Sequence, residues 1–195
     1  MKLLQVLLPA LFLNTAYAQP DAYSIKDLKG GKAKGDSSYA YALPFEKGSS
    51  YFLVQAYDSK LSHRGEFALD FKMKPGSKVA AARDGVVVAV KEDSKVGGTK
   101  KEYLSQGNYV IVQHSDGSYA HYWHLSHEGA LVAMGDSVKS GQVIGLSGNT
   151  GYSAFPHLHF EVTSSAQTGS RQLPTRFYTN KGIRYLRPAH WYKAP

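Results

Sequence analysis

The stretch HLHFEVT, residues 157–163, alternates polar and apolar side chains. Successive side chains of a β-strand point to opposite faces of a sheet, so this stretch predicts a strand that buries its apolar members in a core. The polar members then share the other face: His157, His159 and Glu161. Because a strand rises about 3.3 Å per residue, the two imidazoles stand about 7 Å apart at their Cα atoms. That spacing lets one bind a metal while the other reaches a water molecule beside it.

Short apolar runs of this kind recur from about residue 41 onward, separated by turn-forming residues. The expected strands span residues 51–56, 67–71, 78–82, 86–90, 109–113, 119–125, 142–146 and 157–163. Two dipeptides between neighbouring runs, Asp84-Gly85 and Asp116-Gly117, predict hairpins. No long window shows the 3.6-residue period of a helix. The sequence therefore predicts an all-β fold, either a sandwich or a barrel.

Composition limits the chemistry. The chain has 195 residues, 43% of them apolar, which is enough for one domain with a real core. Its 23 Lys and Arg against 15 Asp and Glu give a net charge of +8, which fits an anionic or polymeric partner such as nucleic acid or bacterial cell wall. The absence of cysteine excludes disulfides, thiolate zinc sites and cysteine nucleophiles. Any metal ligand must therefore be His, Asp or Glu.

The N-terminus predicts export. A basic start, an apolar run over residues 3–13 and small residues at Ala16 and Ala18 are typical of a cleavable signal peptide, assigned here to residues 1–18. We therefore expect a periplasmic or secreted product without stable membrane insertion after cleavage. Residues 19–40 are polar and lack periodicity, which predicts a flexible arm. A single domain should follow over 41–195, with a C-terminal extension from about residue 164.

Asp70 lies within a run, residues 67–71, that is otherwise apolar. A lone buried carboxylate is costly unless it is paired or binds a cation. Two interpretations stay open: a metal ligand, or a carboxylate that caps a turn or pairs with Arg83. His63 precedes this run in a loop. Together with Asp70 and one histidine of the 157–163 stretch, it would form a three-ligand zinc site with an open position.

Residues 119–125 contain two more histidines. His121 and His124 differ by three positions, so in a continuous strand they face opposite sides and at most one joins the site. Tyr122 shares a face with His124 in such a strand, and spacing alone does not choose between the histidines. We interpret the others as ordinary loop or strand-end residues: His114, His127 and His190.

The order of these motifs resembles the lysostaphin-like (LytM-type) zinc endopeptidases, which cut peptide bridges in peptidoglycan. The resemblance runs from about Pro44 to Thr163 and includes GDSVKSGQVIG at residues 135–145. Its most specific part is Gly148-Asn149-Thr150-Gly151 followed by HLHFEV. It implies an antiparallel β-sandwich or barrel-like core of the LytM type and a Zn²⁺-dependent endopeptidase.

The resemblance also implies residue roles. It makes His63, Asp70 and His159 the zinc ligands, and His124 and His157 the catalytic histidines, because the family's Tyr-x-His-Leu phrase matches residues 122–125. Where the family often spaces its first His and Asp by four, the gap here is seven. Residues 64–69 are therefore expected to form a loop insertion.

The implied substrate is the peptide stems of peptidoglycan, acted on by a monomer. The crosslink stays open between D-Ala-diaminopimelate and a glycine bridge. Several aromatic side chains either line a substrate groove or belong to the core: Tyr103, Tyr119, Tyr122 and Trp123. The segment 164–195 either binds wall glycans or adds an edge strand.

Three alternative functions are considered beside this one. The first is a non-catalytic wall-binding protein or an activator of another wall hydrolase on the same fold. The second is a cupin-like metal barrel, although Glu161 follows the HxH pair too closely for that pattern. The third is a nucleic-acid binder, which would use the basic charge without needing the ordered histidines, and we do not expect it.

Overall fold

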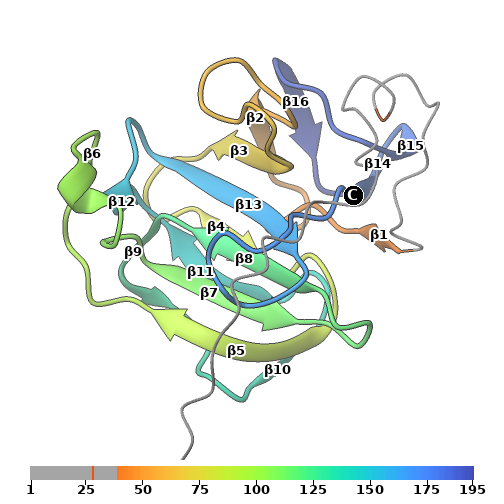
Figure 1. Ribbon diagram of the computed structural model, residues 1–195. Coiled ribbons are helices and arrows are strands. Elements are labelled where there is room, and N and C mark those ends of the chain that lie inside the picture. The colour runs from red at the N-terminus through yellow and green to blue at the C-terminus, as the bar shows by residue number, and fades with distance from the viewer. Residues whose placement is uncertain (1–27, 29–38) are drawn as a thin grey trace, which may run out of the picture.

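The computed structural model describes Leu28 and residues 39–195 (Figure 1). The predicted signal peptide, and the predicted arm apart from Leu28, Tyr39 and Ala40, lie outside the described residues. Strands dominate this part of the chain, which also contains a three-residue 3-10 helix, η1 (Lys101–Tyr103). No helix among the described residues is long and apolar enough to cross a membrane. The all-β prediction is confirmed.

The largest sheet has eight strands, and each pair of neighbours is antiparallel. In spatial order these are β10 (Ser137–Val138), β5 (Gly85–Lys91), β7 (Tyr109–Gln113), β8 (Tyr119–Trp123), β13 (His157–Thr163), β3 (Ala68–Lys72), β2 (Ser50–Gln55) and β16 (His190–Lys193). Figure 1 shows β13 running between β8 and β3. The stretch that predicted the fold is therefore a central strand.

Three smaller sheets complete the fold. Their strands, in spatial order, are β4 (Lys78–Ala80), β11 (Val143–Ser147) and β9 (Leu125–Ala130); β1 (Ala40–Tyr41), β14 (Arg176–Thr179) and β15 (Gly182–Arg184); and β12 (Gly151–Tyr152) with β6 (Gly97–Gly98). None of these sheets closes into a barrel, and two of their pairings, β1 with β14 and β12 with β6, are parallel. The core is therefore built between open sheets.

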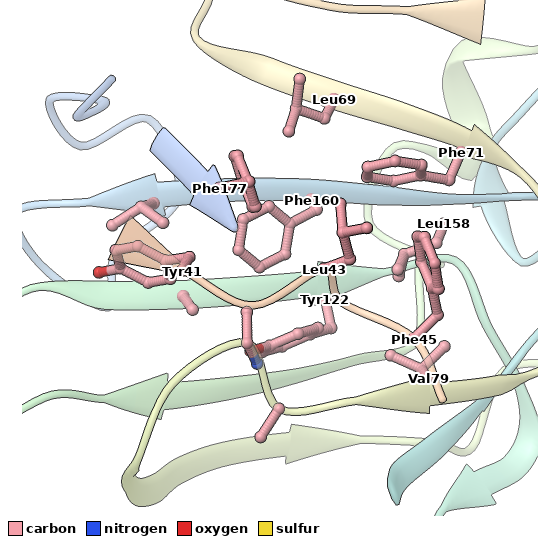
Figure 2. Close-up of a cluster of buried hydrophobic side chains, with 14 of the residues drawn as sticks. Tyr41, Leu43, Phe45, Leu69, Phe71, Val79, Tyr122, Leu158, Phe160 and Phe177 are labelled. Carbon is pink, nitrogen blue, oxygen red and sulfur yellow. The ribbon is translucent and has the colours of Figure 1, made fainter. Parts of the chain in front are cut away.

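One face of the large sheet forms the core (Figure 2). Leu158 and Phe160 on β13 are fully buried, as the alternation predicts, and Phe160 packs against Phe177 from β14 with ring centroids 5.8 Å apart. Tyr122 packs on the other side of Phe160 at 5.2 Å and accepts a hydrogen bond from the Ala82 amide through its hydroxyl. Tyr122 is therefore a core residue, and the interpretation that it lines a substrate groove is wrong.

Two of the expected strands, 109–113 and 157–163, have the predicted bounds. Asp116-Gly117 forms the β7–β8 hairpin, and Gly117 has the positive φ of 80° that such a turn favours. The hairpin predicted at Asp84-Gly85 is wrong, because β4 pairs with β11 while β5 pairs with β7 and β10. This dipeptide instead carries the chain from one sheet to another.

The expected strand 119–125 is interrupted. Strand β8 ends at Trp123, His124 adopts a left-handed φ of 64°, and β9 begins at Leu125 in a different sheet. At the other end of the chain, β16 pairs with β2 at the edge of the large sheet, which confirms that the C-terminal segment adds an edge strand.

Replacing Phe160 by Ala is expected to lower the free energy of unfolding by about 3–5 kcal/mol, because it leaves a cavity between Tyr122 and Phe177. Urea denaturation followed by circular dichroism measures this change. The control Leu104→Ala, at a side chain that is 66% exposed, should stay within about 0.5 kcal/mol of the parent. Equal losses in the two variants would contradict the assignment of Phe160 to the core.

Candidate active site

The site lies on the face of the large sheet opposite the core. Strand register makes Asp70 of β3 and His159 of β13 direct cross-strand partners, and His159 also faces Trp123 of β8. Directly opposed side chains share a face and lie close enough to touch. The pairing of β3 with β13 therefore fixes the first contact of the site.

Asp70 is the centre of the cluster, and only 3% of its surface is exposed. Its Oδ1 lies 2.9 Å from Nδ1 of His159 and 3.6 Å from Nε2 of His157. Its Oδ2 lies 3.2 Å from Nε2 of His63 and accepts a 2.6 Å hydrogen bond from Nε2 of Gln55. Both carboxylate oxygens are thus aimed at imidazoles.

These contacts determine the ionisation state of Asp70. Burial by itself raises the pKa of Asp70, but the interactions with the imidazoles of His159 and then His63 outweigh it and hold the pKa well below its ordinary value. Burial lowers the pKa of His159, yet the hydrogen bond and charge of Asp70 raise it overall. Asp70 is therefore ionised at neutral pH. The alternative that it pairs with Arg83 is wrong, because Arg83 binds Asp116 at 2.5 Å.

His63 is held by the loop that precedes β3. Its Nδ1 lies 3.1 Å from the Ala68 carbonyl, so in the neutral ring Nδ1–H donates and Nε2 keeps a lone pair facing Asp70. A turn closes the intervening loop, with the Glu66 amide donating to the His63 carbonyl and Gly65 at a φ of 75°. The longer gap between His63 and Asp70 is thus taken up by this turn, but the loop insertion expected over residues 64–69 is wrong at residues 68 and 69, which belong to β3.

His124 enters the site through the break between β8 and β9. Its ring centroid lies 4.6 Å from that of His157 and 5.9 Å from that of His159. The prediction that it shares a face with Tyr122 is wrong, because the positive φ at His124 ends the two-residue alternation. Its Nδ1–H donates to the Thr150 carbonyl over 2.7 Å, which leaves Nε2 free to accept a proton.

His157 is oriented in the same way. Its Nδ1 lies 2.7 Å from the Phe155 carbonyl and 3.2 Å from Oγ of Ser153. Burial lowers the pKa of His157. For His124, burial is the largest cause and the charges of His157 and His159 add to it, and together they lower the pKa to about 3. Both rings are therefore neutral at pH 7, with Nε2 unprotonated.

The structure brings all five predicted site residues together in two overlapping groups. One is His63, Asp70 and His159, and the other is His124, His157 and His159. Within each group the potential ligand atoms lie within 4.8 Å of one another. The first group contains the carboxylate, whereas the second is built from imidazoles alone.

The remaining histidines lie apart from these groups. His121 is fully buried, with Nε2 2.8 Å from Oγ1 of Thr163, and His114 has Nδ1 2.8 Å from the Asp84 carbonyl. Nδ1 of His127 lies 3.2 Å from the Glu92 carbonyl, and His190 is exposed on β16. The prediction that at most one of His121 and His124 joins the site is confirmed.

Sequence reasoning missed Gln55. Strict alternation places Gln55 on the same face as Leu53, which is in the core. A β-bulge between them makes Leu53 the partner of Phe71 but Gln55 the partner of Asp70. No signal in the sequence marks that bulge, and none marks the carbonyls of Thr150 and Phe155 as partners of the histidines.

Several known proteins resemble this chain in sequence. Glycyl-glycine endopeptidase ALE-1 of Staphylococcus capitis is 34% identical over 152 residues, covering 77% of this chain and 38% of that protein. Peptidoglycan DD-endopeptidase ShyC of Vibrio cholerae is 39% identical over 138 residues, covering 68% of this chain and 28% of that protein. The chain thus spans less than half the length of these relatives.

A solved structure shares the fold. The catalytic domain of the prophage-encoded M23 protein EnpA from Enterococcus faecalis superposes with a TM-score of 0.51 at 27% identity, covering 66% of this chain and 92% of that domain. The family model described as Peptidase family M23 matches residues 63–171, more than half of the chain. That segment starts at His63 and includes every residue of the two groups. The chain therefore belongs to peptidase family M23.

Proposed function

We propose that this protein is a zinc-dependent endopeptidase that hydrolyses peptide crosslinks of peptidoglycan in the periplasm or outside the cell. The observation that carries the proposal is an ionised, buried Asp70 between His63 and His159, next to two neutral imidazoles with free Nε2 atoms. Family M23 peptidases are zinc metalloproteases, and relatives of this chain are named as peptidoglycan endopeptidases.

The donor set fits zinc. In its neutral form, His63 turns an unprotonated Nε2 toward a carboxylate oxygen 3.2 Å away, so two acceptors face each other. A cation held by Nε2 of His63, the Asp70 carboxylate and Nδ1 of His159 removes this conflict. Two imidazoles and one carboxylate are ligands that zinc prefers and leave it a net positive charge. When bound, zinc polarises a peptide carbonyl and lowers the pKa of water.

His124 and His157 supply the proton transfers. Each has Nδ1–H tied to a backbone carbonyl, so each ring is fixed and presents Nε2 as a base. We assign to this pair the removal of a proton from the attacking water, stabilisation of the developing oxyanion and donation of a proton to the leaving amine. The lowered pKa of His124 keeps its ring unprotonated at neutral pH.

The relatives' names span both crosslinks that the sequence leaves open. ALE-1 is named a glycyl-glycine endopeptidase and ShyC a DD-endopeptidase. The activator alternative loses support because all five positions keep a side chain able to bind metal or transfer a proton. The cupin alternative is wrong, because the sheets do not close into a barrel and the family is M23.

The proposal predicts that the purified protein releases uncrosslinked stem peptides from isolated peptidoglycan, and that a zinc chelator stops the release. Mass spectrometry of the new termini names the bond that is cut. Walls with direct crosslinks and walls with glycine bridges serve as the two substrates. If neither wall releases fragments while zinc is bound, the protein is an activator or binding protein instead.

Zinc content distinguishes the two overlapping groups. His63→Ala and Asp70→Ala are expected to lose the metal, because each removes a ligand of the carboxylate-containing group, whereas His190→Ala on the exposed edge strand keeps it. Metal analysis after dialysis against zinc-free buffer gives the ratio per chain. Stoichiometric zinc in both of the first two variants would place the ion elsewhere.

His124→Ala and His157→Ala should each lower turnover on the order of 10²-fold or more while zinc stays bound, because they remove proton transfer and leave the ligands in place. Turnover on a crosslinked muropeptide and zinc content are measured on the same preparations. Loss of zinc from either variant contradicts the division between ligands and catalytic histidines.

A further inference from the structure

The site face continues beyond the histidines to the edge of the large sheet. His157 of β13 is opposite Lys72 of β3, Lys72 is opposite Phe52 of β2, and Phe52 is opposite Trp191 of β16. Cross-strand partners share a face, so one row of side chains leads from a catalytic histidine to the edge strand. Figure 1 shows β16 beside β2 at this end of the sheet.

The length of the row sets the scale of what it can bind. Neighbouring strands lie about 4.8 Å apart, so three steps place Trp191 about 14 Å from His157. An extended peptide spans about 3.5 Å per residue, and about four residues cover this distance. That is the scale of a wall stem peptide.

The far end of the row is aromatic and open. Trp191 is 70% exposed, and its ring centroid lies 5.7 Å from that of Phe52. These two side chains line a surface groove of about 730 Å³, together with Lys72, Lys74 and Pro156. Because Pro156 directly precedes His157, the groove adjoins the candidate active site. A large exposed indole next to a groove is typical of a binding surface.

The groove is also basic. Lys72 and Lys74 are exposed, and neither forms an ion pair within the part of the chain that the structure describes. Their ammonium groups are therefore available to a ligand. Wall stem peptides carry carboxylates. The sugar to which a stem peptide is attached offers a ring face of C–H groups that can stack on an indole. The groove thus matches both parts of such a ligand.

We propose that Trp191, Phe52 and Lys72 form a subsite for the glycan-bearing end of the substrate. The sugar ring stacks on Trp191, and the stem crosses the sheet toward His157 with a carboxylate near Lys72. This inference rests on the proposed function and names the part of the wall that the enzyme holds. Strand β16 lies beyond residue 171, where the family match ends, so Trp191 is an addition to the matched segment.

Binding of uncrosslinked ligands tests the subsite separately from hydrolysis, because they contain no bridge to cut. Two probes are titrated into the full protein by calorimetry: a disaccharide-linked stem peptide and the same stem without sugar. Trp191→Ala is expected to weaken binding of the first probe about tenfold, and Trp191→Phe to restore part of that loss. Tyr178→Ala, at an exposed aromatic of β14, is the matched control and should bind as the parent does.

The two probes separate the possible results. A loss confined to the sugar-linked probe supports the subsite. An equal loss for both probes contradicts the sugar contact, and no loss for either contradicts the role of Trp191. Failure of the parent protein to bind the sugar-linked probe also overturns the inference, whereas the proposed function is decided independently by chelator-sensitive release from crosslinked wall.

Discussion

The structure depends on a carboxylate buried in an apolar strand. An isolated buried charge costs several kcal/mol, and hydrogen bonds from Gln55 and His159 to the Asp70 oxygens offset part of that cost. Both partners lie on neighbouring strands of the same sheet, so their contacts require the observed register. A slip of one residue between β3 and β13 would send His159 into the core and leave Asp70 opposite an apolar side chain. The strand register that buries the core side chains therefore also assembles the candidate site.

The second element of the site is a break in a strand. His124 reaches His157 only because the backbone at His124 is left-handed, which turns the chain from the large sheet into β9. Carbonyls of Thr150 and Phe155 then hold the two rings with Nε2 free. Membership of family M23 and this geometry together support two separate roles. The proposed metal ligands lie on regular strands and in the loop before β3, whereas the histidines proposed for proton transfer lie at strand ends.

Much of this arrangement could be predicted from the sequence. Alternation over residues 157–163 gave the central strand, its core face and the placement of His159, because a regular strand has a fixed period. Alternation failed at His124 and Gln55, where a left-handed residue and a bulge change the count. The hairpin predicted at Asp84-Gly85 also failed, because a local turn signal does not say which sheet the next strand joins. These errors share one cause. In each case the local backbone conformation depends on which distant segments pair, and a local sequence pattern does not contain that information.

The most direct test of the central claim is a zinc-edge anomalous difference map from crystals of the zinc-loaded protein. The account predicts one peak at about 2.0–2.2 Å from Nε2 of His63, a carboxylate oxygen of Asp70 and Nδ1 of His159. His124 and His157 should then face the ion without ligating it. A peak among His124, His157 and His159, or the absence of any peak at the site, would contradict it.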